Sequence, residues 1–192
     1  MPRTTTARED AIAAAARLFD RSGYHGAGLA EILEQSGAPR GSFYFHFPGG
    51  KEELGVEAIR HAGGQVTAML HAAAAKDPDP VAILGRVSRA LAKWLQASDY
   101  TQGCAVSNVA LETANGLPAL REACDQQYDD WVAALRKPIV DAGCPRAEAT
   151  AVARATVAGI EGALLLCRAS KSTAPLRDVT KVLSRLLAGA AE

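Results

Sequence analysis

Aromatic residues, paired cysteines and net charge are all scarce in this chain. Only 5% of its 192 residues are aromatic, its four cysteines form no CxxC pair, and its formal net charge is zero. The wide cysteine spacing argues against a disulfide framework and against a zinc site, so we expect buried or free thiols. A neutral chain also lacks the basic excess with which many proteins bind nucleic acid.

Long apolar runs and catalytic motifs are missing as well. No segment reaches the roughly 18 uninterrupted apolar residues of a membrane span, and residues 1–10 lack the apolar stretch of a signal peptide. Neither HExxH, a P-loop nor GxSxG occurs, and the spacing of His61 and His71 is unlike that of metal ligands on one helix. We therefore expect a cytoplasmic protein with no membrane contact, metal, cofactor or enzymatic activity.

The residues that are present favour helices. Hydrophobic residues make up 48% of the chain, and alanine, the best helix former, is abundant. Apolar residues recur at helical spacing, with no sustained strand-like alternation, and Gly, Pro and Ser separate the periodic segments. The pattern predicts an all-α fold of about nine helices, at residues 7–22, 29–36, 39–47, 51–75, 81–97, 104–114, 117–142, 146–169 and 176–188.

The short segments at 29–36 and 39–47 are joined by Ser36, Gly37 and Ala38. A tight joint with glycine between two short helices is typical of a helix-turn-helix. The segment at 7–22 is expected to pack across both and to close a small three-helix core. The net charge of this segment neither supports nor excludes DNA binding, because residues 1–51 hold six Lys or Arg against five Asp or Glu, a formal +1.

The segment at 39–47 concentrates aromatic side chains in an aromatic-poor protein. Phe43 and Phe47 lie four residues apart and can be buried on one helix face. Arg40 can hydrogen-bond guanine edges or phosphates, and Phe45 can contact thymine methyl groups. Ser42 can contact either a base or a phosphate, while Tyr44, His46 and Lys51 carry donors suited to phosphates. Two alternatives stay open: Tyr44 as a core residue with its hydroxyl at the surface, and Arg40 as a solvated charge.

The stretch from Gly26 to Leu54 resembles the DNA-binding signature of TetR-family regulators. The small-residue turn around Gly37, the run Gly41–Phe47 and the opening Lys51–Leu54 of the next helix fall in register, and the resemblance extends over residues 8–60. Further likeness to the LmrA/YxaF-like branch lies in residues 39–42, 48–51, 103–106 and 110–112.

Two positions depart from the family pattern. Gly28 stands where Thr or Ser usually caps the second helix, so a hydroxyl is missing there. Phe45 stands where Tyr or His is common, which suggests an apolar contact in place of a hydrogen bond. Together, the residues and the resemblance predict DNA contacts by Gly28, Arg40, Gly41, Ser42, Tyr44, Phe45, His46 and Lys51.

The resemblance implies a transcriptional repressor that binds double-stranded operator DNA as a homodimer and is released by a small-molecule effector. It divides the chain into a helix-turn-helix domain at residues 1–50 and an effector-binding and dimerisation domain at 51–192, with the helix at 51–75 as connector. Family members hold inducers between the C-terminal helices, and aromatic side chains with one polar tip suit a largely hydrophobic ligand. Our lining candidates are Trp94, Asn108, Leu111, Tyr128, Trp131 and Leu164, with ordinary core packing as the alternative.

The last two predicted helices carry long apolar stripes. Two such helices from each subunit can form a four-helix dimer interface, which would place two recognition helices about 34–36 Å apart, one turn of DNA. The alternative is packing within one chain. The stripes predict an interface of Val157, Ile160, Leu164, Leu176, Val179, Leu183 and Leu187.

Other functions remain possible at this stage. A TetR-like activator, or a helical protein that binds small molecules without gene-specific DNA binding, fits the same pattern. An all-α enzyme needs a polar catalytic cluster in the C-terminal half, and none is visible. An architectural DNA protein needs a basic surface, which a neutral chain with a large apolar second half does not provide.

Overall fold

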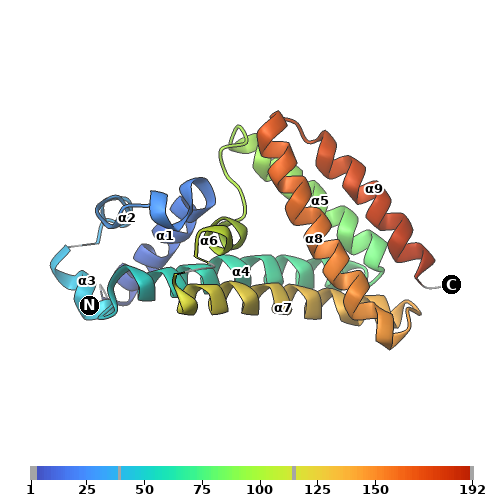
Figure 1. Cartoon of the computed structure of the whole chain (residues 1–192), viewed down its shortest axis with the longest axis horizontal. Coiled ribbons are helices and arrows are strands. Elements are labelled where there is room, and N and C mark those ends of the chain that lie inside the picture. The colour runs from blue at the N-terminus through green and yellow to red at the C-terminus, as the bar shows by residue number, and fades with distance from the viewer. Residues whose placement is uncertain (1–3, 39, 114–115, 191–192) are drawn as a thin grey trace. The chain divides into compact units, whose positions relative to one another are not determined.

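The structure is a computed structural model that describes residues 4–38, 40–113 and 116–190, with the backbone alone for residues 4–6 and 40. Within these residues it is all helical, as expected, and contains nine helices and no strand (Figure 1). They are α1 (Thr4–Gly26), α2 (Leu29–Ser36), α3 (Arg40–His46), α4 (Gly50–Lys76), α5 (Pro80–Ala97), α6 (Ala105–Thr113), α7 (Pro118–Asp141), α8 (Arg146–Ser170) and α9 (Ala174–Gly189).

The ends of eight helices, α2 to α9, lie within two residues of the predicted ends. α1 is the exception, because it continues past its expected stop at Gly23 as far as Gly26. The backbone at Gly23 has φ 71° and ψ −172°, so the helix kinks there. Glycine adopts this positive φ without the steric cost that a Cβ brings. Gly23 therefore marks a break in the helix, but the break is a kink and not the predicted end of the helix.

The chain packs into two compact units. The first consists of Met1–Gly64 and Cys104–Gln127, and the second of Gln65–Gly103 and Tyr128–Glu192. α4 and α7 each contribute to both, and α6 packs on α1 within the first unit. The packing division thus differs from the expected boundary at residue 50, which remains a prediction about function.

The first unit has a core of aromatic and aliphatic side chains. Phe19, Ile32 and Phe47 are fully buried, Phe43 is 2% exposed, and only Leu29 of the expected core is half-buried. Removing such side chains from water is the main favourable term in folding, at roughly 25 cal/mol per Å² of apolar surface. α1, α2 and the segment with Phe43 and Phe47 therefore bury apolar side chains inside the first unit.

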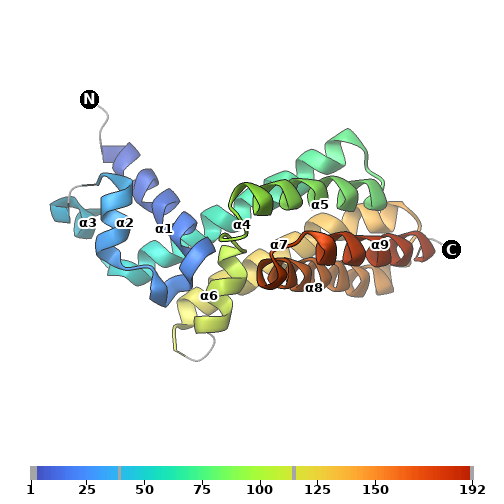
Figure 2. The ribbon, with the colours of Figure 1, turned by 90° about the horizontal axis from the view of Figure 1, so that it is seen from above.

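In the second unit, α5, α8 and α9 lie side by side (Figures 1 and 2). Gly159 permits a close approach of α8 to α9, since a Cβ there would lie 3.1 Å from Leu183 Cδ1 and 3.4 Å from Val179 Cγ1. A hydrogen bond of 2.8 Å from the Thr180 hydroxyl to Ser88 Oγ links α9 to α5. Small residues and one polar pair thus set the spacing of these helices.

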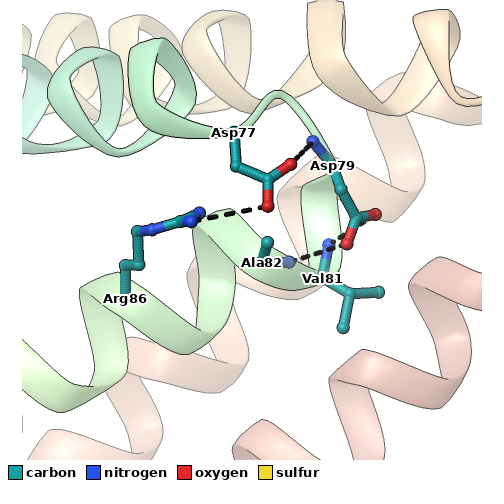
Figure 3. A network of polar contacts seen from close by, with 5 residues as sticks. All are labelled: Asp77, Asp79, Val81, Ala82 and Arg86. Atoms are coloured by element: carbon teal, nitrogen blue, oxygen red, sulfur yellow. Dashed lines mark hydrogen bonds and ion pairs between the residues drawn. The ribbon is translucent and has the colours of Figure 1, made fainter.

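A polar network shapes the corner between α4 and α5 (Figure 3). Asp79 caps α5, because its carboxylate accepts the backbone N–H groups of Val81 at 3.4 Å and Ala82 at 3.1 Å. Asp77 accepts the N–H of Asp79 at 3.1 Å and pairs with Arg86 Nη2 at 3.4 Å. The corner therefore satisfies amide groups that the first helical turn cannot pair by itself.

We expect Asp79→Ala to lower the free energy of unfolding by about 1 kcal/mol, because two amide groups at the start of α5 lose their acceptor. Urea denaturation at fixed protein concentration measures the change. Asp79→Asn is the matched control, since its side-chain oxygen still caps the helix. Equal midpoints for the alanine and asparagine variants would show that the cap contributes nothing.

Candidate functional site

The joint between α2 and α3 is a left-handed turn that requires glycine. Gly37 has φ 66° and donates its N–H to the carbonyl of Glu34 at 3.2 Å. Ser36 Oγ accepts the N–H of Ala38 at 3.1 Å and donates to the carbonyl of Leu33 at 3.0 Å. A positive φ closes a helix cheaply only at glycine or asparagine, so the sequence Ser-Gly-Ala sets this turn.

α3 has an aromatic face on each side. Phe43 and Phe47 point into the core with ring centroids 5.4 Å apart. On the other side Tyr44 is 65% exposed and Phe45 is 79% exposed. Contact between apolar rings and water is unfavourable, and in the single chain both of these rings are exposed to solvent. Tyr44 is therefore not a core residue, which closes the alternative left open by the sequence.

The remaining predicted DNA contacts lie before α2, on α3 and at the start of α4. Gly28 and Gly41 are exposed, and a Cβ at either position would meet no atom within 4 Å. Ser42 and His46 are half-buried, with the His46 ring 5.3 Å from that of Phe45. The side chain of Arg40 lies outside the described part of the chain. Packing inside the protein thus requires neither glycine to lack a side chain.

Lys51 is already engaged inside the first unit. Its ammonium donates to the carbonyl of Tyr24 at 2.7 Å and lies 4.3 Å from the centroid of the Tyr24 ring. Burial lowers the pKa of Lys51, and the negative charge of Glu112 partly offsets this effect. The expectation of a phosphate contact overlooked this internal role, because no sequence spacing links Lys51 to Tyr24.

The six expected ligand-lining residues do not share one unit. Asn108 and Leu111 belong to the first unit, whereas Trp94, Tyr128, Trp131 and Leu164 belong to the second. The Asn108 amide donates to two backbone carbonyls of α1, and Leu111 is 80% exposed. The ligand contacts of these two residues stay a prediction, because helical periodicity placed them on α6 but did not show which neighbour each side chain meets.

The aromatic pair of the second unit is enclosed. Trp131 is 2% exposed, and its ring lies edge-on to that of Tyr128, with centroids 5.3 Å apart. Leu164 is 4% exposed, and Trp94 is half-buried. These four remain ligand candidates, and tight core packing accounts for the same burial.

The expected dimer stripes face inward. Ile160, Leu164, Leu176, Leu183 and Leu187 are at most 8% exposed within the single chain, and Val157 and Val179 are half-buried. Residues so deeply buried have little surface left for a second subunit, and their part in a dimer interface stays a prediction. Both sides of α8 are apolar, so the 3.6-residue period alone did not show which side faces out.

The outward face of the two helices is apolar too. Its large members are Leu165 (62% exposed), Leu166 (55%), Val182 (62%) and Leu186 (42%). On α8 they continue a line of exposed small residues, namely Ala151, Ala155, Ala158, Gly162 and Ala169. We call these residues the outer stripe. Small residues let a second helix approach closely, and exposed leucines give it apolar surface to cover.

α8 is also, among the described residues, the one helix long and apolar enough to cross a membrane. Only 33% of its most apolar window is buried inside the chain. Length and composition alone are weak support for a membrane span, because a helix that packs against protein passes the same test. The observation that matters is that the most apolar helix leaves much of its surface uncovered.

The cysteines and acidic groups form no metal-binding cluster among the residues that the structure describes. Cys124, Cys144 and Cys167 are buried free thiols, and Cys104 is half-buried. Burial raises the pKa of the Cys124 thiol to about 11. The thiolate is the reactive form of cysteine, so Cys124 is unreactive at neutral pH.

Two protein-family models match the chain, one in each half. Residues 11–58 match the family of bacterial regulatory proteins, tetR family, and residues 80–182 match the C-terminal domain of LmrA/YxaF-like transcriptional regulators. The HTH-type transcriptional regulator LmrA of Bacillus subtilis (strain 168) is 33% identical over 180 residues, which cover 94% of this chain and 96% of that protein. The uncharacterized regulator YxaF of the same strain is 32% identical, with 88% of each chain covered.

Solved structures agree with these matches. A regulatory protein TetR from Rhodobacter sphaeroides superposes with a TM-score of 0.82 at 25% identity, covering 93% of this chain and 97% of that one. A TetR transcriptional regulator from Chloroflexus aurantiacus J-10-fl gives 0.81 at 27% identity, with 96% of each chain covered. Proteins of this kind are transcriptional regulators, typically repressors, and typically not enzymes. The chain therefore belongs to the TetR family of DNA-binding transcriptional regulators, with a C-terminal domain of the LmrA/YxaF type.

Proposed function

We propose that the protein is a ligand-responsive repressor that binds a pseudo-palindromic operator as a symmetric dimer and leaves it when a small, largely hydrophobic effector binds. The observation that carries this proposal is the exposed pair Tyr44 and Phe45 on α3, directly after a helix-turn-helix joint. In this motif the second helix enters the major groove. The protein would act in the cytoplasm, where bacterial DNA lies.

The chemistry of α3 suits a groove with thymine methyl groups. Phe45 offers only apolar surface, so it discriminates by contact with a methyl group and not by hydrogen bonding. The Tyr44 hydroxyl is a donor for a phosphate. Gly41 exposes backbone on the same helix, at a position where no internal contact excludes a Cβ. Glycine destabilises the interior of a helix, but it lets another molecule approach the backbone closely.

The outer stripe is the surface that we assign to the second subunit. A two-fold dimer uses the same patch on both subunits, so we assign the exposed apolar residues of α8 and α9 to contact with their own copy. This assignment replaces the inner stripes that the sequence suggested. The pair of subunits would then hold two α3 helices at about 34–36 Å, the repeat of DNA.

In this proposal the dimer has two conformations that differ in the spacing of the two α3 helices, and the effector favours one of them. A ligand can shift this equilibrium only by its differential affinity for the two states. Trp94, Tyr128, Trp131 and Leu164 of the second unit are our candidates for the contact. Their apolar surface, with indole N–H and phenol groups at the edges, suits a mostly hydrophobic, aromatic compound.

The direct test is footprinting on the DNA upstream of the gene that encodes the chain, repeated with a panel of hydrophobic aromatic compounds. We expect one protected palindromic segment, released by at least one compound. Fluorescence anisotropy against random duplex at matched salt gives the specificity ratio. A monomer without preference for any site would contradict the proposal.

Gly41→Ala separates DNA contact from folding. We expect this variant to be up to about 1 kcal/mol more stable, because alanine favours the helix. It should nevertheless bind the protected segment at least about tenfold more weakly, because both half-sites meet a new methyl group. Gly64→Ala is the matched control, since a Cβ there also meets nothing within 4 Å. The control should gain the same stability with unchanged affinity, and equal affinities for both variants would remove Gly41 from the interface.

A further inference from the structure

Asn108 on α6 satisfies the end of a helix to which it does not belong. Its Nδ2 donates to the carbonyls of Phe19 at 3.0 Å and Asp20 at 2.9 Å. These carbonyls belong to the last turn of α1 before the kink at Gly23. The final carbonyls of a helical segment lack partners within it, so a donor from another element is required.

Glu112 follows one turn later on α6 and has the opposite chemistry. Its Oε2 accepts the backbone N–H of His25 at 2.8 Å, which belongs to the short segment after the kink. Free N–H groups at the start of a helical segment favour a carboxylate. α6 therefore presents a donor before the kink and an anionic acceptor after it.

The contact with Glu112 explains why residue 23 is glycine. A Cβ at Gly23 would lie 1.9 Å from Glu112 Oε1 and 2.6 Å from its carboxyl carbon. The backbone there also has φ 71°, which disfavours any side chain. The left-handed backbone at Gly23 and the Glu112 carboxylate thus fit one another.

The same carboxylate acts on the start of α4. Lys51 donates to the Tyr24 carbonyl and lies over the Tyr24 ring, and this carbonyl belongs to the same peptide group as the His25 N–H that Glu112 accepts. Burial lowers the pKa of Lys51, and the negative charge of Glu112 offsets part of that effect. Lys51 is the second residue of α4 and follows α3 after a short turn, in which Gly50 donates its N–H to Phe47 at 2.9 Å. Contacts that hold the Lys51 side chain therefore also hold the junction between α3 and α4.

From these contacts we infer that Glu112, together with Asn108, is a positioning residue for DNA binding: α6 sets the α1 kink and, through Tyr24 and Lys51, the junction of α3 with α4. This inference rests on the proposed function. His25 and Glu112 are both exposed, so water can replace their hydrogen bond and its contribution to stability is small. The contact matters because it determines where the junction lies.

The test uses full-length protein, the duplex from upstream of its own gene and random duplex of equal length. Glu112→Ala removes the acceptor and the charge, whereas Glu112→Gln keeps an oxygen for His25 but not the charge. Glu122→Ala is the control, because it removes the same charge from an exposed position of the same unit, paired only with the exposed Arg121. Anisotropy titrations over a range of salt give affinity and salt slope, and amide exchange at His25 reports the contact itself.

We expect Glu112→Ala to bind the upstream duplex about tenfold more weakly than the control and Glu112→Gln about threefold more weakly. The salt slope should become shallower for Glu112→Ala, by about 1 for each phosphate contact that a displaced α3 loses. A purely structural role would leave the slope of the folded dimer unchanged. Exchange at His25 should be faster in the alanine variant.

Three results overturn the inference. If both Glu112 variants bind the upstream duplex as tightly as Glu122→Ala does, α6 does not control the position of the junction between α3 and α4. Unchanged exchange at His25 shows that the contact is absent in solution. Should Glu112→Ala lose helical content, the glutamine variant decides alone. If the wild type itself shows no preference for the upstream duplex, the proposed function fails first and the inference with it.

Discussion

Leu165→Glu and Leu166→Glu, made separately, are each expected to convert the proposed dimer into folded monomers and to abolish its proposed binding to an operator. Both side chains are more than half exposed in the single chain, at 62% and 55%, so neither change disturbs the packing of a subunit. In a dimer the new carboxylate is desolvated twice, once for each subunit. A loss of about 2 kcal/mol at each copy weakens the dimer by about 4 kcal/mol, roughly a thousandfold.

Sedimentation velocity across a range of concentrations measures this change, and circular dichroism checks that helical content is kept. Ala133→Glu is the matched control, because it adds the same charge at an exposed position of α7, away from the outer stripe. The control should remain dimeric and bind DNA as the wild type does. Dimers of normal stability in both leucine variants would place the subunit contact elsewhere.

The sequence predicted the helices well because their ends are chemically marked. Gly37 closes α2 in a left-handed conformation, and Asp79 caps α5 ahead of a proline. Such signals are local, so they can be read from neighbouring residues. The kink at Gly23 shows the limit: glycine marks a break, but no local signal shows that the helix bends there beside Glu112, 89 residues further on.

The candidate DNA site was partly accessible to sequence reasoning. The spacing of Phe43 and Phe47 correctly placed those rings in the core, which left Tyr44 and Phe45 outside. Lys51 was different, since its donor role toward Tyr24 is a tertiary contact with no local signature. Periodicity identifies which residues share a face but does not identify the partner of that face.

The surface that we propose for the dimer differs from the one predicted from the sequence for a related physical reason. Along α8 the inner stripe holds Ile160 and Leu164, and the outer stripe holds Leu165 and Leu166. Both have helical period and similar hydrophobicity, so the choice between them depends on how α5 and α9 pack.

Trp131→Ala is expected to cost about 3–5 kcal/mol of unfolding free energy if the indole is part of a filled core. The residue is 2% exposed and its ring lies against Tyr128, so the deletion leaves a cavity that rigid neighbours cannot fill. Urea denaturation at fixed protein concentration measures the loss, because the stability of a dimer depends on concentration. Trp94→Ala, at a half-buried position, is the comparison and should cost less than half as much.

The same measurement distinguishes the two interpretations of Trp131. A tryptophan that lines an effector space has fewer packed neighbours, and its removal forfeits fewer contacts than removal from a filled core. A loss near 1 kcal/mol, combined with weaker binding of the compound that releases the DNA, would assign the residue to the effector contact. A loss of about 3 kcal/mol or more, with effector affinity unchanged, would assign it to the core and leave Trp94 and Tyr128 as the aromatic candidates.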